Sequence, residues 1–288
     1  WLSVIVYAIG IIRLTVIYRL ANWQTFSLVF LSLCSANLIY QLLNGLETSL
    51  VLAAIVWSLV LVSQPMTQMR RISAVILWGL MPFIRPELAI FAGLLWLYQI
   101  KRYQQENLSP KTIFKFMLQD TGIALMVALP WLAWYLIATG WPLPNTMGAK
   151  IAFLSEMHFF LSTKLHVGTL RIIDFLNLAG LGLTIFGLFL FLSPIGRVGL
   201  LFLAIFISLY IVFLPFELPD NWYRYATICL PFLFYGGIIG LTYSLREVRL
   251  IANIFLIIAL LQTALLVPIH WRYYYSYCMQ YSHNQLVE

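Results

Sequence analysis

Long apolar runs, separated by short polar segments, are the feature of this sequence that most constrains its fold. Several of them approach the ~20 residues that an α-helix needs to cross the hydrocarbon core of a bilayer. Hydrophobic residues make up 62% of the 288 positions and charged residues only 9%, which is far less charge than a soluble domain carries. We therefore predict an all-α fold, a polytopic bundle of transmembrane helices.

The hydropathy pattern predicts about ten helical spans in a single transmembrane domain that covers residues 1–288. The expected spans are residues 1–18, 24–43, 47–64, 72–84, 88–100, 120–139, 176–193, 199–215, 226–243 and 250–268. The longest predicted loop, 140–175, contains an apolar, aromatic stretch that is compatible with a segment lying along the membrane interface.

Two of these spans, 72–84 and 88–100, are too short to cross the membrane alone, and they meet at Arg85-Pro86-Glu87. One long helix through this point would divide the Lys and Arg residues eight against seven between the two sides of the membrane. Two separate segments divide them ten against six, and the positive-inside rule favours such a bias. Pro86 also disfavours helix at Arg85. We therefore predict that the chain breaks at Arg85.

This topology gathers polar residues on the outer face of the membrane, opposite predicted cytoplasmic loops at 64–71, 101–119 and 244–249. The outer residues include Glu47, Arg85, Glu87, Asn145, Lys150, Glu217, Asp220 and Arg224. A charge near the bilayer centre costs ~2.5–3.5 kcal/mol on insertion scales, so a charge among apolar helices is read first as functional. We expect an outward-facing polar cavity that is lined by helix ends.

Charge and cysteine usage exclude several other classes of protein. The net charge is +7, but the Lys and Arg residues lie in short loops between spans rather than in a basic stripe, so we expect no nucleic-acid partner. The three cysteines, Cys34, Cys229 and Cys278, lack the paired spacing of a disulfide framework. The four His residues lack the spacing of metal ligands, and we predict no metal and no cofactor.

Four short motifs occur in an order that resembles the GT-C superfamily of polytopic membrane glycosyltransferases. They are Gly45-Leu46-Glu47-Thr48, Arg85-Pro86-Glu87, the segment from Pro142 to Lys150 with Pro-Leu-Pro-Asn-Thr, and Trp222-Tyr223-Arg224-Tyr225 ahead of Pro231. The likeness is strongest to the bacterial arabinofuranosyltransferase-like and mannosyltransferase-like branch. It covers residues from about 42 to 231, most of the chain.

The resemblance implies a sugar transfer on the outer face of a bacterial inner membrane. The donor would be a polyprenyl-phosphate sugar, and the acceptor a lipid-linked or cell-envelope glycan. Arg85, Asn145, Lys150, Arg224 and Tyr225 would bind substrate, because a phosphate leaving group needs cations and donors aimed at it. Glu47 and Glu87 are the candidate catalytic carboxylates, since an acceptor hydroxyl needs a base within hydrogen-bond reach.

The sequence departs from the family pattern in one respect. The family keeps its key acidic residue in the first outer loop, whereas no Asp or Glu precedes Glu47 here. The chain also begins with Trp1, inside an apolar run, so we expect a fragment that lacks the family's first helix and first outer loop. On this interpretation the chain as given does not perform transfer alone, and Glu47 and Glu87 are possible substitutes for the missing base.

Simpler interpretations exist for most of these residues. Glu47 is placed to interact with a helix N-terminus, Arg85 and Glu87 to form a structural ion pair, and Asn145 to form a turn. Arg224 is compatible with a side chain that snorkels to the interface. Two other functions remain open: a transporter or lipid flippase, whose sites should lie near the midplane between repeated halves, and an inactive membrane scaffold.

Overall fold

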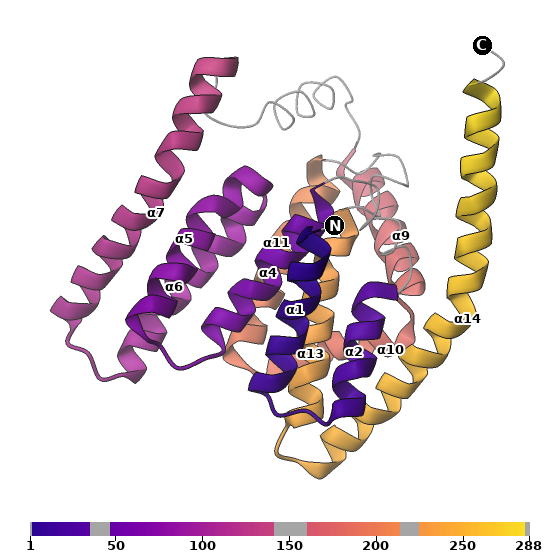
Figure 1. The fold of residues 1–288 in the computed structure, drawn as a ribbon, viewed down its shortest axis with the longest axis horizontal. Helices are drawn as coiled ribbons and strands as arrows, with labels where there is room; N and C mark the ends of the chain where they lie inside the picture. The colour runs from indigo at the N-terminus through magenta and orange to yellow at the C-terminus, as the bar shows by residue number, and fades with distance from the viewer. Residues whose placement is uncertain (1, 35–46, 141–159, 214–224, 286–288) are drawn as a thin grey trace.

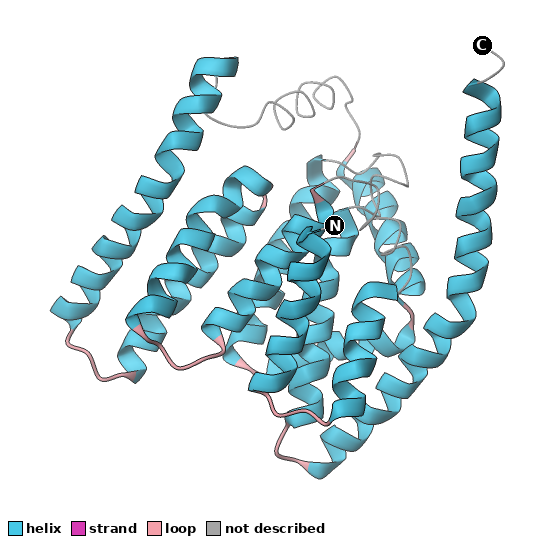
Figure 2. Cartoon of the chain, viewed as in Figure 1, coloured by secondary structure: helices cyan, strands magenta, loops and turns pink. Residues whose placement is uncertain are grey.

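The computed structural model describes residues 2–34, 47–140, 160–213 and 225–285, and this part of the chain contains eleven α-helices and no strand (Figures 1 and 2). An all-α fold is thus confirmed. The helices are α1 (Leu2–Ile17), α2 (Asn22–Cys34), α4 (Thr48–Val62), α5 (Gln68–Ile84), α6 (Leu88–Gln105), α7 (Pro110–Thr139), α9 (Leu161–Ala179), α10 (Leu181–Phe189), α11 (Pro194–Phe213), α13 (Leu230–Thr242) and α14 (Arg246–Gln285). Two short 3₁₀ turns, Leu190–Leu192 and Thr227–Cys229, precede α11 and α13.

Helices α4 and α13 form the centre of the bundle. Both are apolar on every side, and nearly every residue of each is buried. A helix with this pattern must be surrounded by other apolar helices or by lipid. Helix α1 packs along α4, while α10 and α14 pack against α13. The glycines of α13 allow a close approach to α10, where a side chain at Gly236 would collide with the backbone of Phe186.

Helices α7 and α14 lie at opposite edges of the bundle (Figure 1), and most residues of their apolar windows are not buried. In α7, large apolar side chains such as Met126 and Trp134 are 72% and 66% exposed. Within the described residues, three helices are long and apolar enough to cross a membrane: Pro110–Thr139, Pro194–Ile211 and Arg246–Leu266. Exposed apolar helices of this length are typical of a protein whose surroundings are lipid.

The predicted break at Arg85 is confirmed. Helix α5 ends at Ile84, Arg85 has extended backbone angles (φ −153°, ψ 133°), and α6 starts at Leu88. Pro86 favours the break, because its ring disfavours helical geometry for the preceding residue. At the other end, Thr67 caps α5 by accepting a hydrogen bond from the amide of Arg70.

Several boundaries differ from the prediction, the largest shift being α14, which continues to Gln285 instead of ending at 268. Helix α7 starts at Pro110, inside the predicted loop 101–119, because Ser109 caps it and proline suits a first helical turn. Helix α9 occupies 161–179, where the loop 140–175 was predicted; residues 141–159 lie outside the described part of the chain. The predicted span 176–193 is interrupted at Gly180, whose φ of 84° suits glycine and separates α9 from α10.

The connections α1–α2, α4–α5, α6–α7 and α13–α14 all lie at one end of the bundle, the lower end in Figure 1. The junction between α5 and α6 lies at the opposite end. The predicted cytoplasmic loops 64–71 and 244–249 coincide with connections of the first group. The bundle therefore separates its basic loops from Arg85 by the length of α5.

Gly79 is expected to be essential for the packing of α5 against α7. A Cβ atom at this position would lie 2.8 Å from the carbonyl oxygen of Ala124, and backbone cannot move aside as a side chain can. We expect Gly79→Ala to lower the free energy of unfolding by roughly 1–3 kcal/mol. Gly93→Ala in α6 is the matched control, because nothing lies within 4 Å of its Cβ position. Thermal unfolding in detergent measures both, and equal stability of the two variants would contradict the prediction.

Candidate functional site

A cluster of charged and aromatic side chains surrounds Arg85 at the junction of α5 and α6. The guanidinium is 5% exposed, and its Nη2 lies 2.6 Å from Oε1 of Glu87. Its Nε lies 3.9 Å from Oε1 of Glu47, at the start of α4. Two helix starts and one helix end therefore bring two carboxylates to a single buried cation.

Both carboxylates occupy the N-cap positions of their helices, Glu47 before α4 and Glu87 before α6. Neither side chain makes a hydrogen bond that caps its own helix. The geometry instead directs both toward Arg85, which supports the ion-pair interpretation of Glu87. The two differ in accessibility, since the side chain of Glu47 is 33% exposed and that of Glu87 is 16% exposed.

Two tyrosines complete the cluster. The ring of Tyr225 lies beneath the guanidinium, 4.7 Å from the Cζ atom of Arg85, in a cation–π arrangement. Tyr210, in α11, donates a hydrogen bond from its hydroxyl to Oε1 of Glu87 at 2.8 Å and lies 3.4 Å from Nη2 of Arg85. The two tyrosine rings contact each other at 4.7 Å between centroids. Arg85 is thus held on one side by an aromatic face and on the other by carboxylates.

The Nη1 nitrogen of this arginine makes no hydrogen bond within the described structure. Nη1 of Arg85 is buried and has no hydrogen-bond partner among the described residues. A buried donor without an acceptor costs about 1–3 kcal/mol, so native structures rarely leave one. Nη1 is therefore the atom of this cluster best suited to receive an oxygen ligand.

The structure brings together four of the seven predicted site residues: Glu47, Arg85, Glu87 and Tyr225. The other three, Asn145, Lys150 and Arg224, lie outside the described residues. Glu47, Arg85 and Glu87 come from a stretch of 41 positions, but Tyr225 is far from them in sequence, and the fold of α11 and α13 places it there.

Sequence reasoning missed Tyr210 and a second buried charge cluster. Tyr210 lies within an apolar run, where a tyrosine gives no signal of its contact with Glu87. The second cluster joins Arg71 to the fully buried Asp120, with 3.0 Å between Nε and Oδ1. Tyr103 donates to Oδ2 of Asp120 at 2.7 Å, and Arg71 also lies over the ring of Phe116. This cluster attaches α7 to α5 and α6 at the end of the bundle that is remote from Arg85.

The described residues contain no group of three or more His, Cys, Asp or Glu side chains arranged to hold a metal ion. Glu47 and Glu87 are the only carboxylates paired with Arg85 in this part of the chain, and both face its positive charge. The chemistry that the described cluster supports is therefore acid–base and anion chemistry.

Comparison of the chain with protein-family models, curated proteins and solved structures gave no match. The assignment of a function therefore rests on the geometry of the site and on the motifs that carry the resemblance.

Removing the charge of Arg85 should destabilise the protein, because Glu87 would be left buried without its partner. We expect Arg85→Met to lower the free energy of unfolding by about 3–5 kcal/mol. Arg85→Met combined with Glu87→Gln should recover part of this loss. Arg246→Met is the control, since Arg246 is exposed. Chemical unfolding in detergent measures all three, and a double variant no more stable than Arg85→Met would argue against the pair.

Proposed function

We propose that this chain belongs to a GT-C-like membrane glycosyltransferase that uses a polyprenyl-phosphate sugar as donor. The acceptor would be a lipid-linked or cell-envelope glycan on the outer face of a bacterial inner membrane. The observation that carries the proposal is the buried Arg85, which lies between two carboxylates with its Nη1 atom available. This combination suits a reaction in which a phosphate leaves and a hydroxyl loses a proton.

Glu47 is the better candidate for the general base. Oε1 of Glu87 already contacts both Nη2 of Arg85 and the hydroxyl of Tyr210, so this carboxylate is fixed in place. Glu47 is farther from Arg85 and twice as exposed, which gives an acceptor hydroxyl access to it. In this arrangement Glu87 positions Arg85, and Glu47 acts on the acceptor.

Arg85 is assigned to the donor phosphate. Glu87 and Tyr210 engage Nη2, and Glu47 faces Nε, so Nη1 is left to donate to a phosphate oxygen. One guanidinium and two carboxylates give the cluster a formal charge of −1 (+1 − 2). A phosphate therefore needs further cations, and Lys150 and Arg224 are the residues proposed for this role, with Asn145 as a neutral donor.

The transfer proceeds in one step. The acceptor hydroxyl oxygen attacks the anomeric carbon of the donor while Glu47 accepts its proton. The bond between the anomeric carbon and the phosphate oxygen breaks, and the bonding electrons leave with the polyprenyl phosphate. Arg85 stabilises the charge that develops on this phosphate. A base that removes the proton contributes roughly 10²–10⁴-fold in rate.

The membrane arrangement proposed for this enzyme has about ten spans. The three long apolar helices support membrane insertion as such. The further spans, α5 and α6 among them, are proposed from the short apolar helices and from the distribution of charge. With the basic loops in the cytoplasm, the Arg85 cluster faces the periplasm, where a polyprenyl-linked sugar would reach it from the lipid.

We expect Glu47→Gln to reduce sugar transfer by about 10²–10⁴-fold, because it removes the base and keeps the shape of the side chain. Arg85→Lys should also lose most activity, since a point charge cannot replace the guanidinium fork. The assay uses full-length protein in proteoliposomes with polyprenyl-phosphate sugars. Glu106→Gln, an exposed change at the opposite end of the bundle, is the control. Near-normal transfer by stably inserted Glu47→Gln protein would remove Glu47 as the base.

Cysteine labelling tests the proposed orientation. In a background without Cys34, Cys229 and Cys278, Ser109→Cys should be protected from a membrane-impermeant maleimide in intact cells, and Ser155→Cys should be labelled. Both should react after the membrane is permeabilised. Labelling of position 109 from outside would show that the orientation is the opposite one, with Arg85 on the cytoplasmic side.

A further inference from the structure

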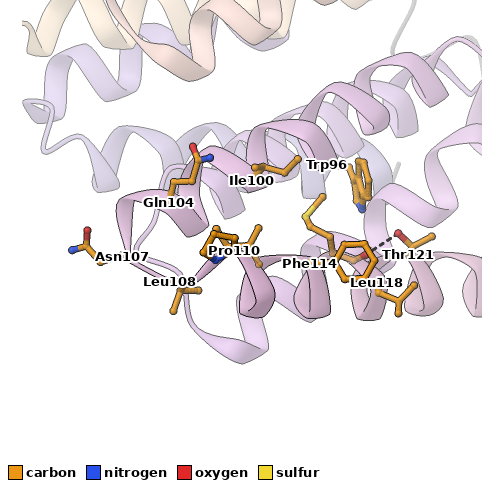
Figure 3. A pocket seen from close by; sticks show the side chains of 11 residues that line it. Trp96, Ile100, Gln104, Asn107, Leu108, Pro110, Phe114, Leu118 and Thr121 are labelled. Carbon is orange, nitrogen blue, oxygen red and sulfur yellow. Dashed lines mark hydrogen bonds between the residues drawn. The ribbon is translucent and has the colours of Figure 1, made fainter.

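An apolar groove lies between α6 and α7, at the end of the bundle opposite Arg85. Its volume is about 790 Å³, which is within the ~300–1,000 Å³ typical of ligand pockets. Trp96 and Ile100 line it from α6, and Phe114 and Leu118 line it from α7 (Figure 3). Its lining is mainly aliphatic and aromatic, so a hydrocarbon chain fits its chemistry better than a polar ligand does.

The groove is flanked by lysines on both helices. Lys101 lies three residues before the lining residue Gln104 in α6. In α7, Lys111 and Lys115 lie three residues before Phe114 and Leu118. Residues three apart in a helix share a face, so each lysine is adjacent to the lining on its own helix.

These lysines are not neutralised by the protein. All three are exposed, and none forms an ion pair with a described residue. Glu106 is the single carboxylate between positions 101 and 115, and the nearby Asp120 is engaged by Arg71. The N-terminus of α7, which starts at Pro110, adds partial positive charge to the same region.

The length of α7 places this region at the membrane surface. At 1.5 Å per residue its 30 residues extend for ~45 Å, whereas the hydrocarbon core is ~30 Å thick. No charged residue occurs from 121 to 139, so this part is the one suited to the core. The first ten residues, which carry Lys111 and Lys115, then reach the level of the lipid headgroups.

We propose that the groove between α6 and α7 binds an anionic phospholipid. One acyl chain occupies the apolar groove, and the phosphate headgroup lies among Lys101, Lys111 and Lys115. Charge complementarity selects this occupant, because lysines beside a transmembrane helix at the membrane surface attract anionic headgroups. A neutral lipid would fill the groove and leave the lysines without a partner. This inference is independent of the proposed sugar transfer, since it concerns the other end of the bundle.

Native mass spectrometry of the purified chain tests the proposal, with phosphatidylglycerol and phosphatidylcholine of identical acyl chains as probes. We expect the wild-type protein to retain phosphatidylglycerol in preference to phosphatidylcholine. Lys111→Gln combined with Lys115→Gln should lower the apparent affinity for phosphatidylglycerol by about tenfold or more and change that for phosphatidylcholine little. Both positions are exposed, so the variant should fold.

The matched control is Arg246→Gln combined with Arg249→Gln. It removes the same charge from the first turns of α14, another exposed helix start, which lies below α13 and away from α6 and α7 (Figure 1). The control should keep the wild-type preference. Equal losses in the two variants, or no preference in the wild-type protein, would overturn the proposal.

A second variant tests the groove itself. Ile100→Trp fills the apolar space without changing charge and should reduce retention of phosphatidylglycerol. The same spectra report the oligomeric state. A dimer of the wild-type chain that becomes a monomer in Ile100→Trp would show that a second copy occupies the groove, and the lipid proposal would be wrong.

Discussion

The need of every apolar segment to satisfy its backbone hydrogen bonds internally is the constraint on which the structure depends. Backbone groups in hydrocarbon have only each other to bond with, so the described chain is helical almost wherever it is apolar. Association of such helices cannot rely on hydrophobicity alone, because lipid tails are as apolar as the helices. Close packing through small residues supplies part of the attraction, as Gly79 shows against α7 and Gly236 against α10.

The two main clusters of buried charges lie near the two ends of helix α5, and each joins residues from different helices. Helix α5 connects the two main clusters, with Arg71 in its first turns and Arg85 just after its last residue. Arg71 pairs with Asp120 of α7, and Arg85 pairs with Glu87 and approaches Glu47. Breaking either pair leaves a buried charge, so both clusters fix the positions of the helices that contribute to them.

The Arg71–Asp120 cluster and the Arg85 cluster differ in the groups that they leave available for a ligand. Asp120 is fully buried and contacts both Arg71 and Tyr103, so it anchors α7 to α5 and α6. The Arg85 cluster instead combines a partly exposed carboxylate with a guanidinium nitrogen, Nη1, that has no hydrogen-bond partner in the described part of the chain. This difference is the physical reason to propose chemistry at one end of the bundle and lipid attachment at the other.

The sequence by itself determined the all-α class, the presence of helices long and apolar enough to cross a membrane, and the break at Arg85, because hydropathy and proline act locally. It also identified Glu47, Arg85 and Glu87 as charges out of place among apolar segments. The ion pair of Arg85 with Glu87 was already one of its interpretations. Only the tertiary structure brought Glu47 within 3.9 Å of the same guanidinium and placed Tyr210 of α11 against Glu87. Contacts between residues more than 100 positions apart depend on how whole helices pack, and an apolar helix gives no periodic signal of which neighbour it will face.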